Sequence, residues 1–253
     1  MKNIFRNVGI LALACFSFLV TDETITVVKE SDKLMIEIKE KASLYYVEGV
    51  DGKIDDNYIR LGYDGLEIDM LKSYDQMKKI GYFNENMIIY KHIKPTNSLK
   101  DNKSKIIKGN FKNEISLVFK NPDNIDKIIK ILSNNSITGS FLISKEYYLN
   151  NFEAIEVALN NSNDIIILDE YNFFKKELNK NYFCYSNLYE KCSGKYIVEE
   201  SFKIKNYKEL KDKLNRGSIV LIEETNYLDI YIKYILSRGF KVVNMNNFIS
   251  ENI

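Results

Sequence analysis

The chain has 253 residues and carries 36 Lys or Arg against 35 Asp or Glu, so its formal net charge at pH 7 is +1. This balance excludes a general electrostatic attraction to nucleic acid, and we expect no nucleic-acid partner. A hydrophobic fraction of 45% excludes a disordered chain, and the single histidine, His92, excludes a zinc site built from several imidazoles.

The first 23 residues have the pattern of a secretory signal peptide or a signal anchor. Lys2 and Arg6 precede the apolar run Val8–Val20, and polar residues follow it at once. As a helix this run spans about 20 Å, against about 30 Å for the hydrocarbon core of a bilayer. Because no small-x-small cleavage site follows, we expect a retained membrane anchor and a chain outside the cytoplasmic membrane, secreted if the segment is cleaved. A buried core helix is the alternative.

Residues 24–109 form a charged, irregular region, which we interpret as an N-terminal extension of mixed α+β structure followed by a linker. Its segment 31–42 fits two patterns, because Ser31 could cap a helix whereas Leu34, Ile36 and Ile38 alternate as in a strand. The other elements follow from β-branched runs, glycine stops and turn residues. They are a strand at 24–29, turns at 49–65, a helix at 73–80, a strand at 87–91 and a polar linker at 95–109.

From Asn110 onward, short apolar runs alternate with helical patterns. In the first helix, Asp123 or Asn124 is the cap, and apolar residues at i, i+3, i+4 and i+7 from Ile125 form one buried stripe. Repeated strand–helix units predict a parallel sheet, and their number, about seven, favours a small distorted barrel over an open sheet. The expected strands are 115–119, 140–144, 164–168, 182–185, 195–199, 218–222 and 240–244, and the later helices are 145–159, 207–214 and 227–237.

Cysteine usage leaves two alternatives open. Cys184 and Cys192 are eight residues apart, which is not the CxxC spacing of a zinc or redox motif, and Cys15 lies in the leader. If the chain is exported, Cys184 and Cys192 could form a disulfide. Two buried free thiols are the other interpretation.

The segments of the C-terminal part resemble, in their order, the polysaccharide deacetylases with a NodB homology domain, carbohydrate esterase family 4. This resemblance implies that residues 110–253 form a distorted (β/α) barrel of the NodB/glycoside hydrolase-deacetylase type, preceded by a leader helix and a small irregular α+β region. The matching segments are ISLVFKNP (115–122), ITGSFLI (137–143), NDIIILDEYN (163–172), RGSIVLIEET (216–225) and LSRGFKVVNMNNFI (236–249).

The preceding segment adds a narrower resemblance. Residues 62–94, GYDGLEIDMLKSYDQMKKIGYFNENMIIYKHIK, are similar to the segment before the NodB domain in a sporulation-associated subgroup from endospore-forming bacteria. These patterns are not part of deacetylases in general. The resemblance therefore implies a membrane or cell-wall setting that is linked to sporulation.

Placed residue by residue, the resemblance puts the family's general base at Lys120 and its metal-binding aspartate at Asn121. The two metal-binding histidines fall at Leu168 and Asn172, and the general acid falls at Glu223. A leucine has no ligand atom, and a lysine at the base position adds positive charge where the cation would sit. We therefore expect no catalytic residue, no metal and no other cofactor at these positions.

The rate enhancement that would be lost with these residues favours a pseudoenzyme. One positioned acid or base contributes about 10²–10⁴ in rate, and a metal ion adds several kcal/mol of transition-state stabilisation. The alternative is a carbohydrate-active hydrolase, a deacetylase or glycosidase with altered site residues. Asp169, Glu170, Glu223 and Glu224 follow two strands and would place four carboxylates on the rim of the barrel, although short acidic loops also cap helix N-termini.

Polar side chains at the same rim could still bind sugar. The family's arginine-containing motif corresponds to Cys184-Tyr185-Ser186, which adds an aromatic ring. We expect either weak binding of cell-wall glycan, with a Kd of about 1 mM, or docking of a protein partner. The candidate glycan-binding residues are Asn121, Asn172, Tyr185, Glu223 and Glu224.

Overall fold

The computed structural model describes residues 31–178, 182–192 and 194–252. These residues divide into an N-terminal unit, residues 31–48 and 65–93, and a C-terminal unit, residues 49–64 and 94–252. The sequence-based boundary at 109/110 falls inside strand β5 (Ile106–Asn110). The leader and the strand expected at 24–29 lie outside the described residues. Within the described residues, no helix is both long and apolar enough to cross a membrane.

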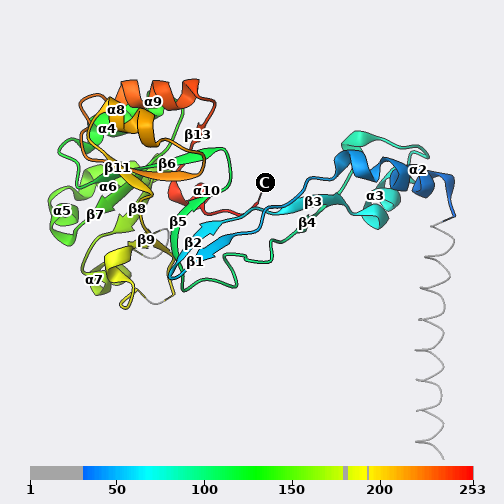
Figure 1. Ribbon diagram of the computed structural model, residues 1–253, viewed down its shortest axis with the longest axis horizontal. Helices are drawn as coiled ribbons and strands as arrows, with labels where there is room; N and C mark the ends of the chain where they lie inside the picture. Colours follow the sequence, from blue (N-terminus) through cyan, green and yellow to red (C-terminus); the bar gives the residue numbers. More distant parts are fainter. Residues whose placement is uncertain (1–30, 179–181, 193, 253) are drawn as a thin grey trace, which may run out of the picture. The chain divides into compact units, whose positions relative to one another are not determined.

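The N-terminal unit consists of two short helices and a two-stranded antiparallel sheet (Figure 1). Its elements are α2 (Lys33–Lys41), α3 (Met70–Met77), β3 (Gly65–Ile68) and β4 (Tyr90–Ile93). Segment 31–42 is therefore a helix, and its cap is Asp32 rather than Ser31: an Asp32 carboxylate oxygen accepts a hydrogen bond from Leu34 N at 2.9 Å. Burial of residues 34, 35 and 38 follows the helical period, not the period of two.

The C-terminal unit contains a large, mainly parallel sheet, as the alternating pattern predicts. Its strands are hydrogen-bonded in the order β1-β2-β5-β10-β9-β8-β7-β6-β12-β11, with β13 also on β6, and only β1–β2 is antiparallel. The bounds are β1 (Lys53–Asp55), β2 (Tyr58–Leu61), β5 (Ile106–Asn110), β6 (Glu114–Lys120), β7 (Ser140–Ile143), β8 (Asp164–Ile167), β9 (Tyr182–Tyr185), β10 (Ile197–Val198), β11 (Phe202–Ile204), β12 (Ser218–Ile222) and β13 (Lys241–Val242).

This sheet curls into a half-barrel. Strands β5 and β12 are far apart in the pairing order, yet Asn110 N donates to Gly217 O at 2.9 Å. The Ser201 hydroxyl also joins them, because it donates to Lys108 O at 2.8 Å and accepts from Ile219 N at 3.0 Å. Segment 95–109 is therefore not only a linker, since it contains β5, and the expected turns at 49–65 contain β1 and β2.

Helices cover the outer face of the curled sheet (Figure 1). They are α4 (Ile125–Asn134), α5 (Lys145–Asn150), α6 (Phe152–Asn160), α7 (Tyr171–Glu177), α8 (Tyr207–Lys213) and α9 (Leu228–Ser237), whereas the short α10 (Met245–Phe248) lies on the inner side of the sheet. The helix expected over 145–159 is two helices, because Asn151 leaves the helical conformation at φ −132°. Neither α7 nor β11 was expected from the sequence.

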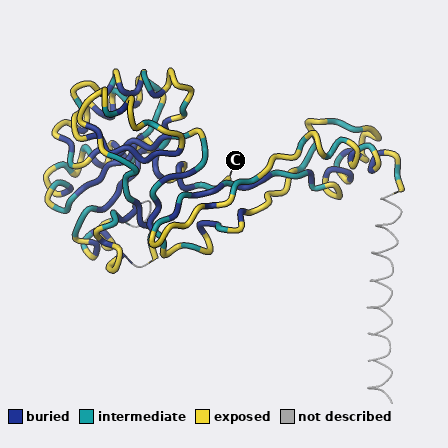
Figure 2. The backbone as a smooth tube through the Cα atoms, in the orientation of Figure 1, coloured by how far each residue is buried: buried dark blue, intermediate teal, exposed yellow. Residues whose placement is uncertain are grey.

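The strands separate two hydrophobic cores, and their residues are buried along most of their length (Figure 2). Side chains alternate between the faces: Leu117 and Phe119 pack outward against the helices, whereas Val118 packs inward. Helix α10 fills the inner side with Met245 and Phe248, which are fully buried. The inner core is therefore a packed interior and not an open channel.

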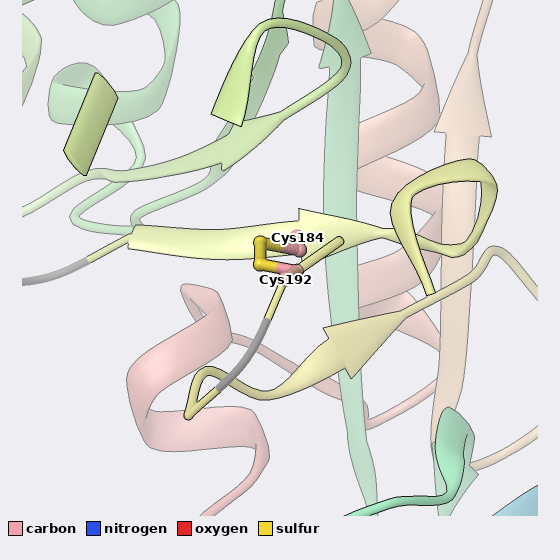
Figure 3. Close-up of a disulfide and its surroundings, with 2 residues drawn as sticks. All are labelled: Cys184 and Cys192. Atoms are coloured by element: carbon pink, nitrogen blue, oxygen red, sulfur yellow. A yellow bond between two sulfur atoms is a disulfide. The ribbon is translucent and has the colours of Figure 1, made fainter. Parts of the chain in front are cut away.

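The structure joins Cys184, in β9, to Cys192 in a disulfide (Figure 3). Their Cα atoms are 6.3 Å apart, within the usual range for such a bond. Both residues are buried. Of the two alternatives that the sequence leaves open, the structure has the disulfide.

Candidate functional site

The strand register brings the expected site positions to one edge of the sheet. Strands β12, β6, β7, β8 and β9 are neighbours, all parallel, so their carboxyl ends meet at the same edge. Ile222 pairs with Phe119, so Glu223 follows β12 beside Lys120, the last residue of β6. Ile167 of β8 pairs with Cys184 of β9, so Leu168 follows beside Tyr185.

Alternation along each strand decides which of these side chains share the inner face of the rim. The inner core contains Val118, Ile166, Phe183 and Leu221. Residues two positions further along lie on the same face of their strands. The residues at those positions are Lys120, Leu168, Tyr185 and Glu223.

Asn121, at the family's metal-binding aspartate, binds Ser144 with both polar groups of its side chain. Its side-chain oxygen accepts from Ser144 N at 3.0 Å, and its amide nitrogen donates to the Ser144 hydroxyl at 3.3 Å. Its backbone has φ +38°, a left-handed conformation that Asn adopts more readily than most residues. Asn121 therefore joins the ends of β6 and β7.

Leu168, at the first histidine position, is half-buried and packs against the inner core. It extends the apolar interior up to the rim. Asn172, at the second histidine position, is an exposed residue of the first turn of α7. It lies in a helix that the sequence interpretation did not contain.

The acidic pair after β8 has a structural role in part. An Asp169 carboxylate oxygen accepts from Lys145 N, at the start of α5, at 2.8 Å. Negative charge at a helix N-terminus is stabilising, which is the alternative that the sequence offers for these acidic loops. Glu170 is exposed and adopts φ +48° at the start of α7.

Tyr185 belongs to a polar network at the end of β9. Its hydroxyl donates to a Glu200 carboxylate oxygen at 2.5 Å, and Lys203 Nζ lies 3.2 Å from the other oxygen of Glu200. Burial raises the pKa of Tyr185 well above its usual value, and the hydrogen bond to Glu200 raises it further. The phenol therefore stays protonated and acts as a donor.

The late strand ends in two exposed carboxylates, Glu223 and Glu224. A carboxylate oxygen of Glu223, at the family's general acid, lies 3.5 Å from Lys205 Nζ; the side chain of Lys205 is 69% exposed and that of Glu223 is 35% exposed. Lys120, at the family's general base, is also exposed. The rim thus presents both positively and negatively charged side chains.

This donor set does not fit the metal ion of the family. Leu168 has no ligand atom, and both polar groups of Asn121 are used by Ser144. Within the ranges that the structure describes, no three His, Cys, Asp or Glu residues are placed to hold a metal ion. His92 belongs to β4 of the N-terminal unit.

Sequence reasoning missed the residues that hold the rim together, Ser144, Glu200, Lys203 and Lys205. Glu200 had an available signal, because it comes soon after the strand expected at 195–199, and carboxyl ends of strands are where sites form in barrels. Ser144 had one too, as it ends the strand expected at 140–144. The lysines come from β11 and the loop after it, which the sequence interpretation left out.

Comparisons of sequence and structure relate this chain to known proteins. No family model matches the chain. It is 27% identical over 150 residues to the uncharacterized protein YlxY of Bacillus subtilis (strain 168), a match that covers 56% of this chain and 47% of that protein. The chain thus spans about half the length of this curated relative.

Three solved structures share the fold. BA3943 of Bacillus anthracis, described as a CE4 family pseudoenzyme, matches with a TM-score of 0.63 at 17% identity over 88% of this chain and 96% of that one. A BA3943 mutant with restored enzymatic activity matches with 0.64, also at 17% identity, over 87% and 99%. The Bc1960 peptidoglycan N-acetylglucosamine deacetylase matches with 0.50 at 15% identity over 63% and 98%. The chain therefore has the α/β fold of the NodB-type CE4 deacetylases, as expected.

Proposed function

We propose that this protein is a polysaccharide-deacetylase-like protein without deacetylase activity, which binds cell-envelope glycan, or a protein partner, through the rim of its half-barrel. The observation that supports the loss of activity most strongly is Leu168. It stands at a metal-ligand position of the resembling family and packs on the inner core. Replacing a leucine that packs on the core by a water-accessible metal-binding side chain would cost stability.

The rest of the rim supports binding. Three exposed charged residues, Lys120, Lys205 and Glu223, offer donors and acceptors, and Tyr185 offers an aromatic ring at a neighbouring strand end. Carboxylates and ammonium groups hydrogen-bond to hydroxyls, and a phenol ring can stack on a pyranose. Such a surface binds sugar without hydrolysing it. Asn172 and Glu224, both exposed, border the same strand ends.

We also propose an extracytoplasmic, sporulation-linked setting with membrane attachment through the first 23 residues. Support comes from the leader pattern and from the resemblance of residues 62–94 to the sporulation-associated subgroup. The related pseudoenzyme of Bacillus anthracis adds a precedent for an inactive chain with this fold.

The test is a titration of full-length, isotope-labelled protein in detergent micelles with chitin and peptidoglycan oligosaccharides. A fragment beginning at Asn110 is unsuitable, because it would lack β1, β2 and most of β5. We expect shifts around Tyr185 and Glu223, a Kd of about 1 mM, and no acetate release.

Matched variants make the titration specific. Tyr185→Phe and Glu223→Gln should weaken binding several-fold, whereas Tyr82→Phe, at an exposed residue of the N-terminal unit, and Glu156→Gln, at an exposed residue of α6, should not. Absence of any shift at millimolar sugar would contradict glycan binding and leave the protein partner. Acetate release that Glu223→Gln abolishes would instead support a hydrolase with altered site residues.

A further inference from the structure

A cavity of about 360 Å³ opens at the other end of β6 from Lys120. Glu114 is the first residue of β6 and pairs with Lys241, the first residue of β13. A strand of seven residues spans about 20 Å, so the cavity is separate from the rim. It is lined by Tyr63, Phe111, Lys112, Asn113, Glu114, Arg216, Lys241 and Asn252.

The walls of this cavity are fixed by backbone hydrogen bonds. Gly217 N donates to Glu114 O at 2.8 Å, and Lys241 N donates to Asn113 O at 3.1 Å. The Arg60 guanidinium donates to Arg216 O at 2.7 Å. A ligand would therefore enter a preformed site, which lowers the ordering cost of binding.

The charges that line the cavity are mostly positive. Arg216, Lys112 and Lys241 face one acidic residue, Glu114. Lys112 Nζ donates to Asn252 O, but no carboxylate of the described chain lies within 4.0 Å of the charged groups of Arg216 or Lys241. Within the part of the chain that the structure describes, these two cations are therefore available to bind an anion.

Glu114 adds a carboxylate oxygen that lacks a hydrogen-bond donor. Its Oε2 atom is buried and has no hydrogen-bond partner among the described residues. A buried acceptor without a donor destabilises the fold, so a ligand that brings a donor to this carboxylate would be favoured. Burial raises the pKa of Glu114, whereas the charges of Lys112 and Lys241 and the side chain of Asn110 lower it.

Two aromatic rings complete the lining. The Arg60 guanidinium covers one face of Phe111, with its carbon 4.4 Å from the ring centroid. Tyr63 is half-buried at the cavity wall. Together the lining offers cations, one acceptor that lacks a donor, and an aromatic surface.

We propose that this cavity binds a sugar that carries a carboxylate or a phosphate group. The anionic group pairs with Arg216 and Lys241, a ring hydroxyl donates to the half-buried Glu114 carboxylate, and the ring lies against Tyr63. The proposal concerns a site separate from the rim and does not depend on the function proposed for the rim.

The experiment is a ligand-observed NMR titration of the full-length chain with glucuronate, glucose 6-phosphate, glucose and acetate. We expect the better of the two acidic sugars to bind at least tenfold more tightly than glucose or acetate, because only the acidic sugars have both the anion and the hydroxyls. The stronger acidic sugar identifies whether carboxylate or phosphate is preferred. Equal binding of glucose and both acidic sugars would overturn the proposal.

Variants separate the two halves of the recognition. Arg216→Ala and Lys241→Ala should each weaken binding of the acidic sugar about tenfold, whereas Arg238→Ala and Lys208→Ala, exposed residues outside the cavity, should not. Glu114→Gln should reduce the preference for the acidic sugar over acetate. If both variants fold normally and Arg216→Ala and Lys241→Ala leave the affinity unchanged, the proposed site is refuted.

Discussion

Replacing the buried Asp164 by Asn should remove a specific part of the pH dependence of stability. Asp164 is the first residue of β8 and is only 3% exposed. Its carboxylate oxygens accept from Asn246 N at 2.8 Å and from the Asn246 side-chain amide at 2.7 Å. It thereby fixes the start of α10, the helix that fills the inner core.

Burial raises the pKa of Asp164 from 3.8 to about 6, although the hydrogen bonds from Asn246 lower it. The folded state therefore holds the proton more tightly than the unfolded state. The resulting stabilisation is complete below about pH 3.8 and is lost as the pH rises through about 6. The full effect is about 3 kcal/mol, of which about 1 kcal/mol appears between pH 7 and pH 5.

The assay is hydrogen exchange of the β8 amides in wild type and in Asp164→Asn, at pH 7 and pH 5. The opening free energy of wild type, relative to the variant, should increase by about 1 kcal/mol on going to pH 5. The comparison cancels other titrating groups, and Asp212→Asn, an exposed residue of α8, serves as the matched control. Equal pH dependence in wild type and Asp164→Asn would refute the reasoning.

Two further predictions concern covalent and backbone constraints. The double variant Cys184→Ser/Cys192→Ser should lose about 2–3 kcal/mol of unfolding free energy in urea, because the disulfide closes a loop with a sequence separation of 8; a loss below about 0.5 kcal/mol would contradict this. Gly217→Ala should prevent folding of the C-terminal unit, because its Cβ would lie 1.8 Å from Asn110 O at φ +67°. Gly239→Ala is the control: at φ +80°, and with nothing within 4 Å of the added Cβ, it should cost only about 1 kcal/mol. Equal thermal stability of the two alanine variants would show that the close approach of Gly217 to Asn110 O does not exclude a side chain.

The sequence predicts the core of the fold because burial and periodicity coincide there. Strand β12 (Ser218–Ile222) is a continuous apolar run that is buried on both faces, and it is predicted to the residue. β5 was missed because its few apolar residues lie in a polar segment, and it exists through pairing with β2 and β10. Such long-range pairing leaves no local signal.

At the candidate site too, the positions can be predicted from the sequence, whereas the contacts between strands cannot. The resemblance locates Asn121 and Leu168 at the strand ends, and chemistry alone indicates that leucine cannot bind a metal. Ser144 and Glu200 could be placed at strand ends from the sequence, but their contacts with Asn121 and Tyr185 could not be predicted, because the partners come from different strands. Ser144 meets Asn121 only through the pairing of β6 with β7, and Glu200 meets Tyr185 only through the pairing of β9 with β10.

The most direct test of the central claim is the zinc content and acetate release of the purified full-length chain on chitin oligosaccharides. It should be compared with a variant that carries the family's residues at all five positions, Lys120→Asp, Asn121→Asp, Leu168→His, Asn172→His and Glu223→His. The account predicts no stoichiometric zinc and no acetate release for the natural chain, and bound zinc for the variant. Stoichiometric zinc and acetate release in the natural chain, both lost in Asn121→Ala, would contradict it.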